Sequence, residues 1–373
     1  MKRSGPSTLC GCSPIAKHTR RPKGRPPRGW RTRAWKAQMS GSPMMEPLGE
    51  TTRPTLLCVS QCPFHLLAWE VPVQGPLPSA GPQTLHPVRG GPKKIGLLHL
   101  CNDKLYKLRP LIDGLNRQFQ LAYGPRREDC VDESIILFKG RSSMKQYNLM
   151  KPIKRGYKIW CLGDMSGFIQ TFQVYQGKQV ETSELQSEFG LGGRVVLDLS
   201  SSILGKGYTL FFDNYFSSVP LMAKLKMEKT CACATIQSNR RQLPELRFDK
   251  SLTRGKYDFK TTEEGITLFK WKDNKVVYII SNYHGCEVGT VERMERDGTK
   301  ITVSCPTALS DYNMFMGGID KADMLRSIFG TDRKSKKGWH RLFFGFLDIC
   351  LVNSYVAYCE FNEKIPYLDC APL

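Results

Sequence analysis

The chain has 373 residues, with 55 Lys and Arg against 34 Asp and Glu and a formal net charge of +21. This length allows about two or three domains with a large core, and the basic excess favours a polyanionic partner such as nucleic acid over a solvated basic surface. The 14 cysteines are scattered and no apolar segment follows Met1, so a secreted disulfide scaffold is not expected and the thiols are expected to be reduced inside the cell.

Residues 1–94 are predicted to be a disordered tail. They contain most of the 23 prolines and many Gly and Arg, without sustained hydrophobic periodicity. The stretch RRPKGRPPRG resembles an AT-hook, whose central Arg25 would enter a narrow A·T minor groove; a nuclear localisation signal and random Arg/Pro-rich text are the alternatives. The closely spaced cysteines in this tail are not expected to bind zinc.

Residues 95–131 are expected to be a short helical region, because Leu105, Leu108, Leu115 and their neighbours recur at helical spacing. Three strands are then predicted, VDESIILF, YKIWCLGD and GFIQTFQVYQG, with a basic loop between the first two. A helix is predicted at RVVLDLSSSIL. The interleaving of strands and helices predicts a mixed α/β sheet over 132–244.

The stretch TLFFDNYFSSVPL, residues 209–221, ends an apolar run on Asp213. A run of this kind, bounded by Gly207 and a polar turn, predicts a central parallel strand. Ser217 or Ser218 would then cap a helix that has Pro220 in its first turn. Asp213 would lie at the carboxyl end of the strand, where α/β proteins place ligand sites; a turn-forming Asp-Asn pair is the alternative.

Residues 245–310 show only antiparallel strand patterns. ITLFKW and KVVYIIS flank the Asp273-Asn274 turn, and TVERMER and KITVS flank Asp297-Gly298. We therefore expect a β-rich module inserted into the α/β core, whose helical second part would cover 311–363 before a short tail at 364–373. The stretch LFFGFLDICLVNSYVAY is apolar enough to suggest a membrane span, but Asp348 near its middle and Asn353 after it argue against one, so a buried helix is predicted.

Four aspartates are candidates for a metal site. Asp132 lies in a predicted strand, Asp213 ends another, and Asp320 and Asp323 are three residues apart on one face of a predicted helix. Converging carboxylates would suit Mg²⁺, and two such ions can support an in-line phosphoryl displacement. Spacing alone does not bring the four together: Asp320 as a helix cap and Asp323 as a solvated residue are the alternatives.

Four motifs resemble the piggyBac transposase family and its domesticated derivatives, in the same order and from about Asp103 to about Asn362. They are VDESIILFKGRSSMKQYNLMKPIKRGYKIW, FFDNYFSS, YNMFMGGIDKADMLRS and RKSKKGWHRLFFGFLD. The resemblance implies a ribonuclease H-like catalytic core with an inserted antiparallel β-rich domain, and DNA cleavage and strand transfer at TTAA sites. It also implies catalytic roles for Asp132, Asp213 and Asp320, with Asp323 as a further ligand for Mg²⁺ or Mn²⁺.

Basic residues follow the first acidic strand and precede the last helix, where they would position DNA through its phosphates. They are Lys139, Arg141, Lys145, Lys151, Lys154, Arg155, Arg333, Lys334, Lys336 and Lys337. A solvated basic face is the alternative. Trp271 and Trp339 are candidates for base stacking or for packing. Family members commonly carry two tryptophans where this chain has Gly338-Trp339.

The expected function is that of a domesticated or truncated, nuclear, double-stranded-DNA-binding protein that keeps the two-metal site without transposing by itself. An active Mg²⁺-dependent DNA transposase is the alternative, and a homodimer is compatible with both. Family transposases usually have a longer helical region before the first catalytic aspartate, and many have a cysteine-rich zinc module, for which Cys359 and Cys370 are too few. We expect neither a zinc module nor a membrane partner.

Overall fold

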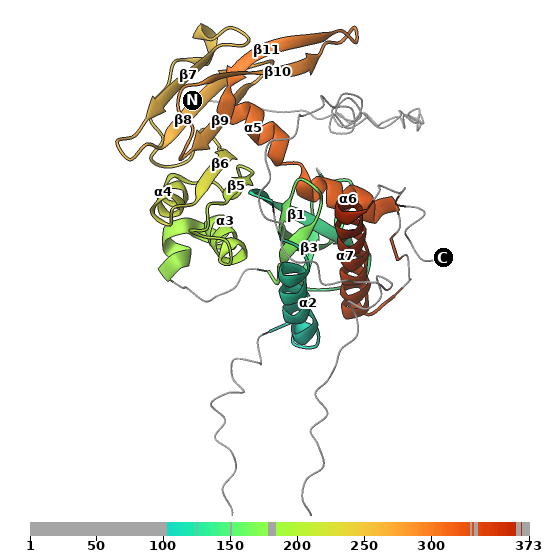
Figure 1. Ribbon diagram of the computed structural model, residues 1–373. Helices are drawn as coiled ribbons and strands as arrows, with labels where there is room; N and C mark the ends of the chain where they lie inside the picture. The colour runs from blue at the N-terminus through green and yellow to red at the C-terminus, as the bar shows by residue number, and fades with distance from the viewer. Residues whose placement is uncertain are drawn as a thin grey trace, which may run out of the picture. The chain divides into compact units, whose positions relative to one another are not determined.

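Figure 1 shows the computed structural model of the chain. The structure describes residues 103–124, 126–149, 151–177, 184–328, 330–331, 335–362 and 367. The tail predicted for 1–94, with Arg25 and its cysteines, lies outside the described residues, so the predictions about it stay predictions.

A mixed sheet organises the described part of the chain, as the sequence predicts. The sheet has 9 strands in the order β2-β3-β1-β5-β6-β9-β8-β7, with β4 also paired to β3, and β10 pairs with β11 in a second sheet. The strands are β1 (Glu128–Leu137), β2 (Lys145–Tyr147), β3 (Arg155–Asp164), β4 (Ile169–Val174), β5 (Thr209–Phe212), β6 (Cys231–Thr235), β7 (Tyr257–Thr261), β8 (Thr267–Lys272), β9 (Val276–Ser281), β10 (Val288–Met294) and β11 (Lys300–Pro306).

The middle of the sheet is parallel. β5 runs parallel to β1 on one side and to β6 on the other, whereas β1 and β3 are antiparallel. Leu210, Phe211 and Phe212 of β5 are at most 1% exposed, which is typical of a central strand covered on both faces. The prediction of a buried parallel strand before Asp213 is therefore confirmed.

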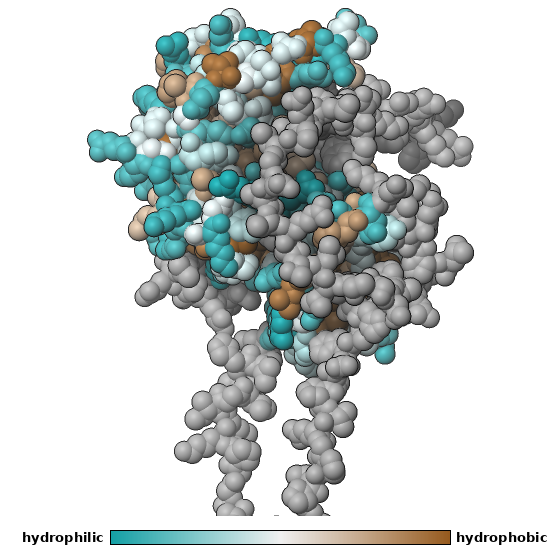
Figure 2. Space-filling view, in the orientation of Figure 1, coloured by the Kyte–Doolittle hydropathy of each residue, from teal (hydrophilic) through white to brown (hydrophobic). Residues whose placement is uncertain are grey.

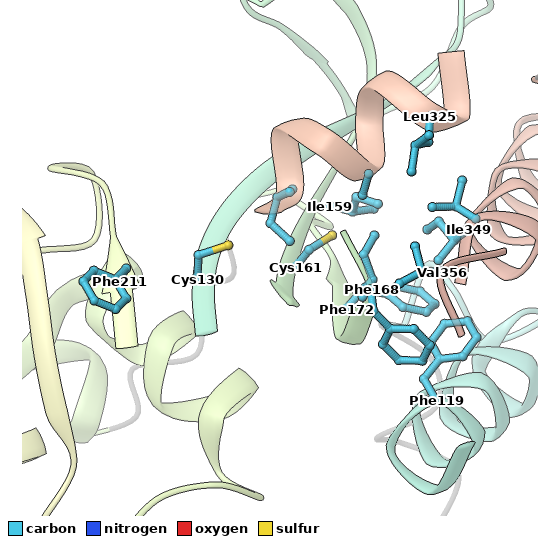
Figure 3. Close-up of a cluster of buried hydrophobic side chains, with 14 of the residues drawn as sticks. Phe119, Cys130, Ile159, Cys161, Phe168, Phe172, Phe211, Leu325, Ile349 and Val356 are labelled. Atoms are coloured by element: carbon cyan, nitrogen blue, oxygen red, sulfur yellow. The ribbon is translucent and has the colours of Figure 1, made fainter. Parts of the chain in front are cut away.

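Helices cover both faces of this sheet. They are α2 (Arg109–Ala122), α3 (Glu184–Ser200), α4 (Val219–Met227), α5 (Thr307–Phe315), α6 (Gly318–Ile328) and α7 (Gly338–Phe361). Cys130 of β1 belongs to a core cluster with residues of α2, α6 and α7, part of which Figure 3 shows. The next residue, Val131, belongs to a second cluster with residues of α3 and α4. This alternation along β1 places the two helical layers on opposite faces of the sheet.

The turn after β5 directs the chain into α4. Ser218 is the N-cap, and its Oγ accepts a hydrogen bond from the Leu221 backbone N–H at 3.3 Å, while proline occupies the first turn. Of the two serines proposed from the sequence, Ser218 thus caps the helix, because a side-chain oxygen there satisfies an otherwise unpaired N–H of the first turn.

The region 245–310 forms the two predicted hairpins, β8–β9 and β10–β11, and an additional strand, β7. β9 pairs with β6 through Cys233 and Ser281, so β7 to β9 continue the central sheet instead of forming a separate one. Helix α5 begins at Thr307, a few residues before the helical second part predicted for 311–363, and Ala308 and Leu309 are buried in its first turn.

Helix α7 is the one helix of the described residues that is long and apolar enough to cross a membrane. Its contacts are those of a helix inside the core. The Asn353 side chain donates to the Ile169 carbonyl and accepts from the Ile169 N–H, both at 2.8 Å. Asp348 accepts hydrogen bonds from the N–H and hydroxyl of Thr331. The predicted helix is present and part of it is buried, and both Asp348 and Asn353 have partners in the protein.

Candidate metal centre

Asp132 and Asp213 occupy equivalent places on adjacent parallel strands. Val131 of β1 is paired with Phe212 of β5, and the two aspartates are the next residue in each case. Asp132 lies inside β1 and is 8% exposed, whereas Asp213 comes directly after β5. The two aspartates therefore follow a paired position of the sheet, and the negative charge of Asp213 contributes to raising the pKa of Asp132. Their catalytic roles stay a prediction.

Asp320 joins them from the first turn of α6. The start of this helix lies close to the sheet because residue 318 is glycine: an added Cβ would stand 2.1 Å from the Asp164 carbonyl oxygen and 3.0 Å from Cys130 Sγ. The Lys151 ammonium lies 3.8 Å from Asp132 Oδ2 and 4.0 Å from Asp320 Oδ1. These two carboxylates therefore share one neighbouring cation.

Asp132 is influenced electrostatically by the other two aspartates. Burial raises the pKa of Asp132 to about 7, with smaller increases from the negative charges of Asp320 and Asp213, while Lys151 lowers it. Buried carboxylates of like charge disfavour full ionisation unless a cation compensates them. Their hard oxygen atoms are the donor type that Mg²⁺ prefers, so the residue types fit such an ion. Within the described ranges, however, no group of three or more His, Cys, Asp or Glu is close enough to hold a metal.

Asp213 is oriented by the ends of two strands. Its Oδ1 accepts hydrogen bonds from the Asn214 N–H at 2.6 Å and from the Thr235 hydroxyl at 2.8 Å. Thr235, at the end of β6, also lies 3.3 Å from the Tyr312 hydroxyl of α5. The Asp-Asn turn and the strand-end position are therefore both present. Thr235 was not among the predicted site residues, because the short CACAT segment carries no strand periodicity. Tyr312 was not among them either, although it begins the motif YNMFMGGIDKADMLRS.

Asp323 has partners of a different kind. Its Oδ1 accepts hydrogen bonds from the Ser134 hydroxyl at 2.6 Å and from the Arg326 guanidinium at 2.9 Å. Arg326 is 8% exposed and also donates to Ser134 and to the Ile135 carbonyl. Burial raises the pKa of Asp323, and Arg326 opposes this increase. These contacts fasten α6 to β1 one turn beyond Asp320; the role of Asp323 as a metal ligand stays a prediction.

The predicted DNA-contacting residues divide into exposed and internally bonded groups. Exposed on the described surface are Lys139, Arg141, Lys154, Arg155, Lys336 and Lys337. The Lys145 ammonium donates to the Gly140 carbonyl, and Lys151 lies in the acidic centre. Arg333 and Lys334 lie outside the described residues. On the face drawn in Figure 2, the described residues are mostly hydrophilic, with hydrophobic ones scattered among them.

The two candidate tryptophans differ in environment. Trp271 is 1% exposed, donates its indole N–H to the Ser304 carbonyl and packs under Arg293, so it is a packing residue. Trp339 is 41% exposed at the start of α7. The preceding Gly338 is required by close packing, since an added Cβ would stand 2.1 Å from the Tyr157 hydroxyl. A tryptophan at position 338 would not fit unless Tyr157 moved.

Comparison with known proteins agrees with the motifs and the mixed α/β sheet. The model of the transposase IS4 family matches residues 95–355. A solved structure of the piggyBac transposase synaptic complex with hairpin DNA superposes with a TM-score of 0.63 at 24% identity, covering 75% of this chain and 58% of that one. The chain therefore belongs to the transposase IS4 family.

Within that family its relatives are of the piggyBac type. The chain is 31% identical over 272 residues to human PiggyBac transposable element-derived protein 3, which covers 70% of this chain and 45% of that protein. It is 30% identical over 266 residues to human PiggyBac transposable element-derived protein 2, covering 68% and 44% respectively. The chain thus spans less than half the length of these two relatives, and the resemblance found in the sequence is confirmed.

Proposed function

We propose that this chain is a DNA-binding protein derived from a piggyBac-type transposase, which keeps an acidic site for divalent metal and does not transpose by itself. The observation that carries the proposal is the position of Asp132 in β1 and of Asp213 just after β5, each following one member of the pair Val131 and Phe212, with Asp320 reaching Lys151 beside Asp132. A ribonuclease H-like core is supported by the order β4-β3-β1-β5-β6, in which the first three strands are antiparallel and the last two follow β1 in parallel.

Asp132, Asp213 and Asp320 would hold the ion, with Asp323 behind them. A divalent ion at this place would offset the negative charge of a DNA phosphate and activate a water molecule. The chain's own contribution is to orient the ligands. Thr235 and the Asn214 N–H hold one oxygen of Asp213, and the Arg326–Asp323–Ser134 contacts fix the helix that carries Asp320. A carboxylate whose orientation is fixed by hydrogen bonds loses little conformational entropy when it binds an ion.

The proposed DNA partner is supported by exposed cations near the acidic strand. Lys139 and Arg141 follow β1, and Lys154 and Arg155 precede and begin β3. They would contact phosphate oxygens and position the duplex without reading its sequence. A nuclear location follows from this proposal, since genomic DNA is the polyanion concerned.

Two assays on the full chain test this function. The chain should bind a TTAA-containing duplex with an affinity that falls steeply as salt increases, because phosphate contacts release counterions. In a cell-based assay, the chain alone should leave a TTAA-flanked cassette in place. Removal of the cassette with resealing of the site would instead establish the alternative, an active transposase, and absence of binding at low salt would contradict the DNA-binding function itself.

A further inference from the structure

Among the predicted basic residues that the structure describes, Lys151 is the one whose charge is directed into the acidic centre. Its ammonium lies 3.8 Å from Asp132 Oδ2 and 4.0 Å from Asp320 Oδ1, and its side chain is only 16% exposed. It also donates a hydrogen bond of 3.0 Å to the Glu133 carbonyl oxygen, which belongs to β1 beside Asp132. The head group is therefore anchored to the strand, whereas most of the predicted DNA-contacting residues have exposed side chains.

The position of this ammonium has an electrostatic reason. The Asp132 side chain is 11% exposed and that of Asp320 is 41% exposed. The negative charge of Asp213 also acts on Asp132 and contributes to raising its pKa. Carboxylates gathered at a buried strand end are costly unless a cation lies among them. The Lys151 ammonium, which is about equally distant from Asp132 and Asp320, provides such a cation from the protein itself, without a metal ion.

We infer that Lys151 is the resident counter-ion of the acidic centre: its ammonium offsets part of the negative charge of Asp132 and Asp320 when no divalent ion is bound, and it has to withdraw before one ion can bind both. This inference rests on the proposed metal site. A divalent ion would need oxygen atoms of both carboxylates at about 2.1 Å. It would then lie close to the present ammonium, and two cations within about 4 Å repel each other strongly.

The lysine side chain suits this role. Its charge is at the end of a flexible four-carbon stem, so the head group can leave without a change of the backbone. In the acidic centre it holds the carboxylates of β1 and α6 near one another, which keeps the start of α6 in place. Lys151 is thus a positioning residue that competes with the metal.

Lys158 offers a matched control. It is a lysine of similar burial, 17% exposed, and its ammonium pairs with the Glu133 side chain at 2.5 Å. Its ring contacts are with Tyr215 and Trp160. Replacement of Lys158 therefore removes a comparable ion pair from the same strand region while the Lys151 contacts with Asp132 and Asp320 are retained.

The test compares Lys151→Met, Lys151→Gln and Lys158→Met with the wild-type full chain, without DNA. Mn²⁺ affinity is measured by calorimetric titration, and the melting temperature is measured with EDTA and with Mn²⁺. Glutamine keeps an N–H donor for the Glu133 carbonyl and removes only the charge, so it separates electrostatics from packing if the methionine variant folds poorly.

Both Lys151 variants should bind Mn²⁺ at least about tenfold more tightly than wild type, because the competing charge is gone. They should melt at a lower temperature in EDTA and recover with Mn²⁺, while Lys158→Met should bind Mn²⁺ as wild type does. Equal or weaker Mn²⁺ binding by both Lys151 variants, with wild type still binding, would overturn the inference and leave the metal site standing. No Mn²⁺ binding by any of the four proteins would overturn both.

Discussion

Asp132 and Asp213 are neighbours across the parallel ladder between β1 and β5, each following one member of the pair Val131 and Phe212. The ladder places the two residues that follow this pair, and the Asn214 N–H and the Thr235 hydroxyl then orient Asp213, which lies just beyond β5. The third carboxylate, Asp320, depends instead on how α6 is fastened to β1. The rigidity of the site therefore has two sources, the sheet for two of the aspartates and a buried ion pair for the third.

Replacement of Arg326 by methionine should destabilise the protein by about 3 kcal/mol, because Asp323 and Ser134 would lose a largely buried cation partner. Urea unfolding measures this change. Arg254→Met serves as the control, since Arg254 makes its ion pairs at the surface, where solvent screens them and their loss should have little effect on stability. Equal effects of the two replacements would show that the Arg326 contacts do not hold α6 to β1.

The pH dependence of stability should change when Asp129 is replaced by asparagine. Burial raises the pKa of Asp129 to about 8, with a further increase from Asp164, which is its partner in the β1–β3 ladder. The folded state thus holds this proton more tightly than the unfolded chain, so wild-type stability falls as pH rises from about 4 to about 8. Asparagine carries no charge, and the variant should be more stable than wild type by about 2 kcal/mol at pH 8.5.

Denaturant unfolding at pH 5 and pH 8.5 measures this difference, which should be much smaller at the lower pH. Asp297→Asn is the control. Hydrogen bonds from Thr299 lower the pKa of Asp297, so its replacement should give no gain at high pH. A gain for Asp129→Asn that is the same at both pH values would contradict the assigned cause, because an uncharged packing effect does not depend on pH.

DNA affinity should decrease in the double variant Arg141→Ala/Lys154→Ala. If each side chain contacts one phosphate, the slope of log affinity against log salt should fall by about 0.9 for each of them. Fluorescence anisotropy over a series of salt concentrations measures both quantities. Lys260→Ala/Lys275→Ala, which removes two exposed lysines of β7 and the β8–β9 turn, is the control for net charge. The same loss of DNA affinity in both double variants would mean that DNA binds at another place or without preference for one part of the surface.

Substitution of Gly338 should reveal its contact with Tyr157. Alanine at 338 should destabilise the protein by about 1–3 kcal/mol, because its Cβ would meet the Tyr157 hydroxyl at 2.1 Å. Removing that hydroxyl with Tyr157→Phe should recover part of the loss in the double variant. A double-mutant cycle measured by thermal unfolding therefore gives a favourable coupling, and strict additivity would show that the clash is relieved in another way.

The sequence was most informative where a pattern is local. The apolar run of β5, the Ser218 cap and the two hairpin turns follow from neighbouring residues, and the ordered motifs indicated the family. β6 was missed because CACAT is short and made of small residues, so it has neither alternation nor β-branched side chains beyond its last residue. A strand of this kind is recognisable only once its neighbours β5 and β9 are in place.

The partners inside the site were harder to predict, because they come from distant segments. Lys151 looked like one of several basic loop residues, and nothing local shows that its ammonium turns back to the Glu133 carbonyl. Arg326 has the charge of an exposed helix residue, yet it is buried because Asp323 and Ser134 compensate it. The partners of Lys151 and Arg326 are determined by contacts between segments that are far apart in the sequence. The same contacts determine which cation lies beside which aspartate.

The most direct test of the metal centre is cleavage of the protein backbone by bound Fe²⁺ with ascorbate, which generates radicals beside the ion and marks the chain segments around it. If Asp132, Asp213 and Asp320 hold one centre, fragments should end near all three residues, Mg²⁺ in excess should suppress them together, and Asp213→Asn should remove all of them at once. Cuts near only one of these residues, or cuts that Mg²⁺ and the Asp213 replacement leave unchanged, would contradict a shared site.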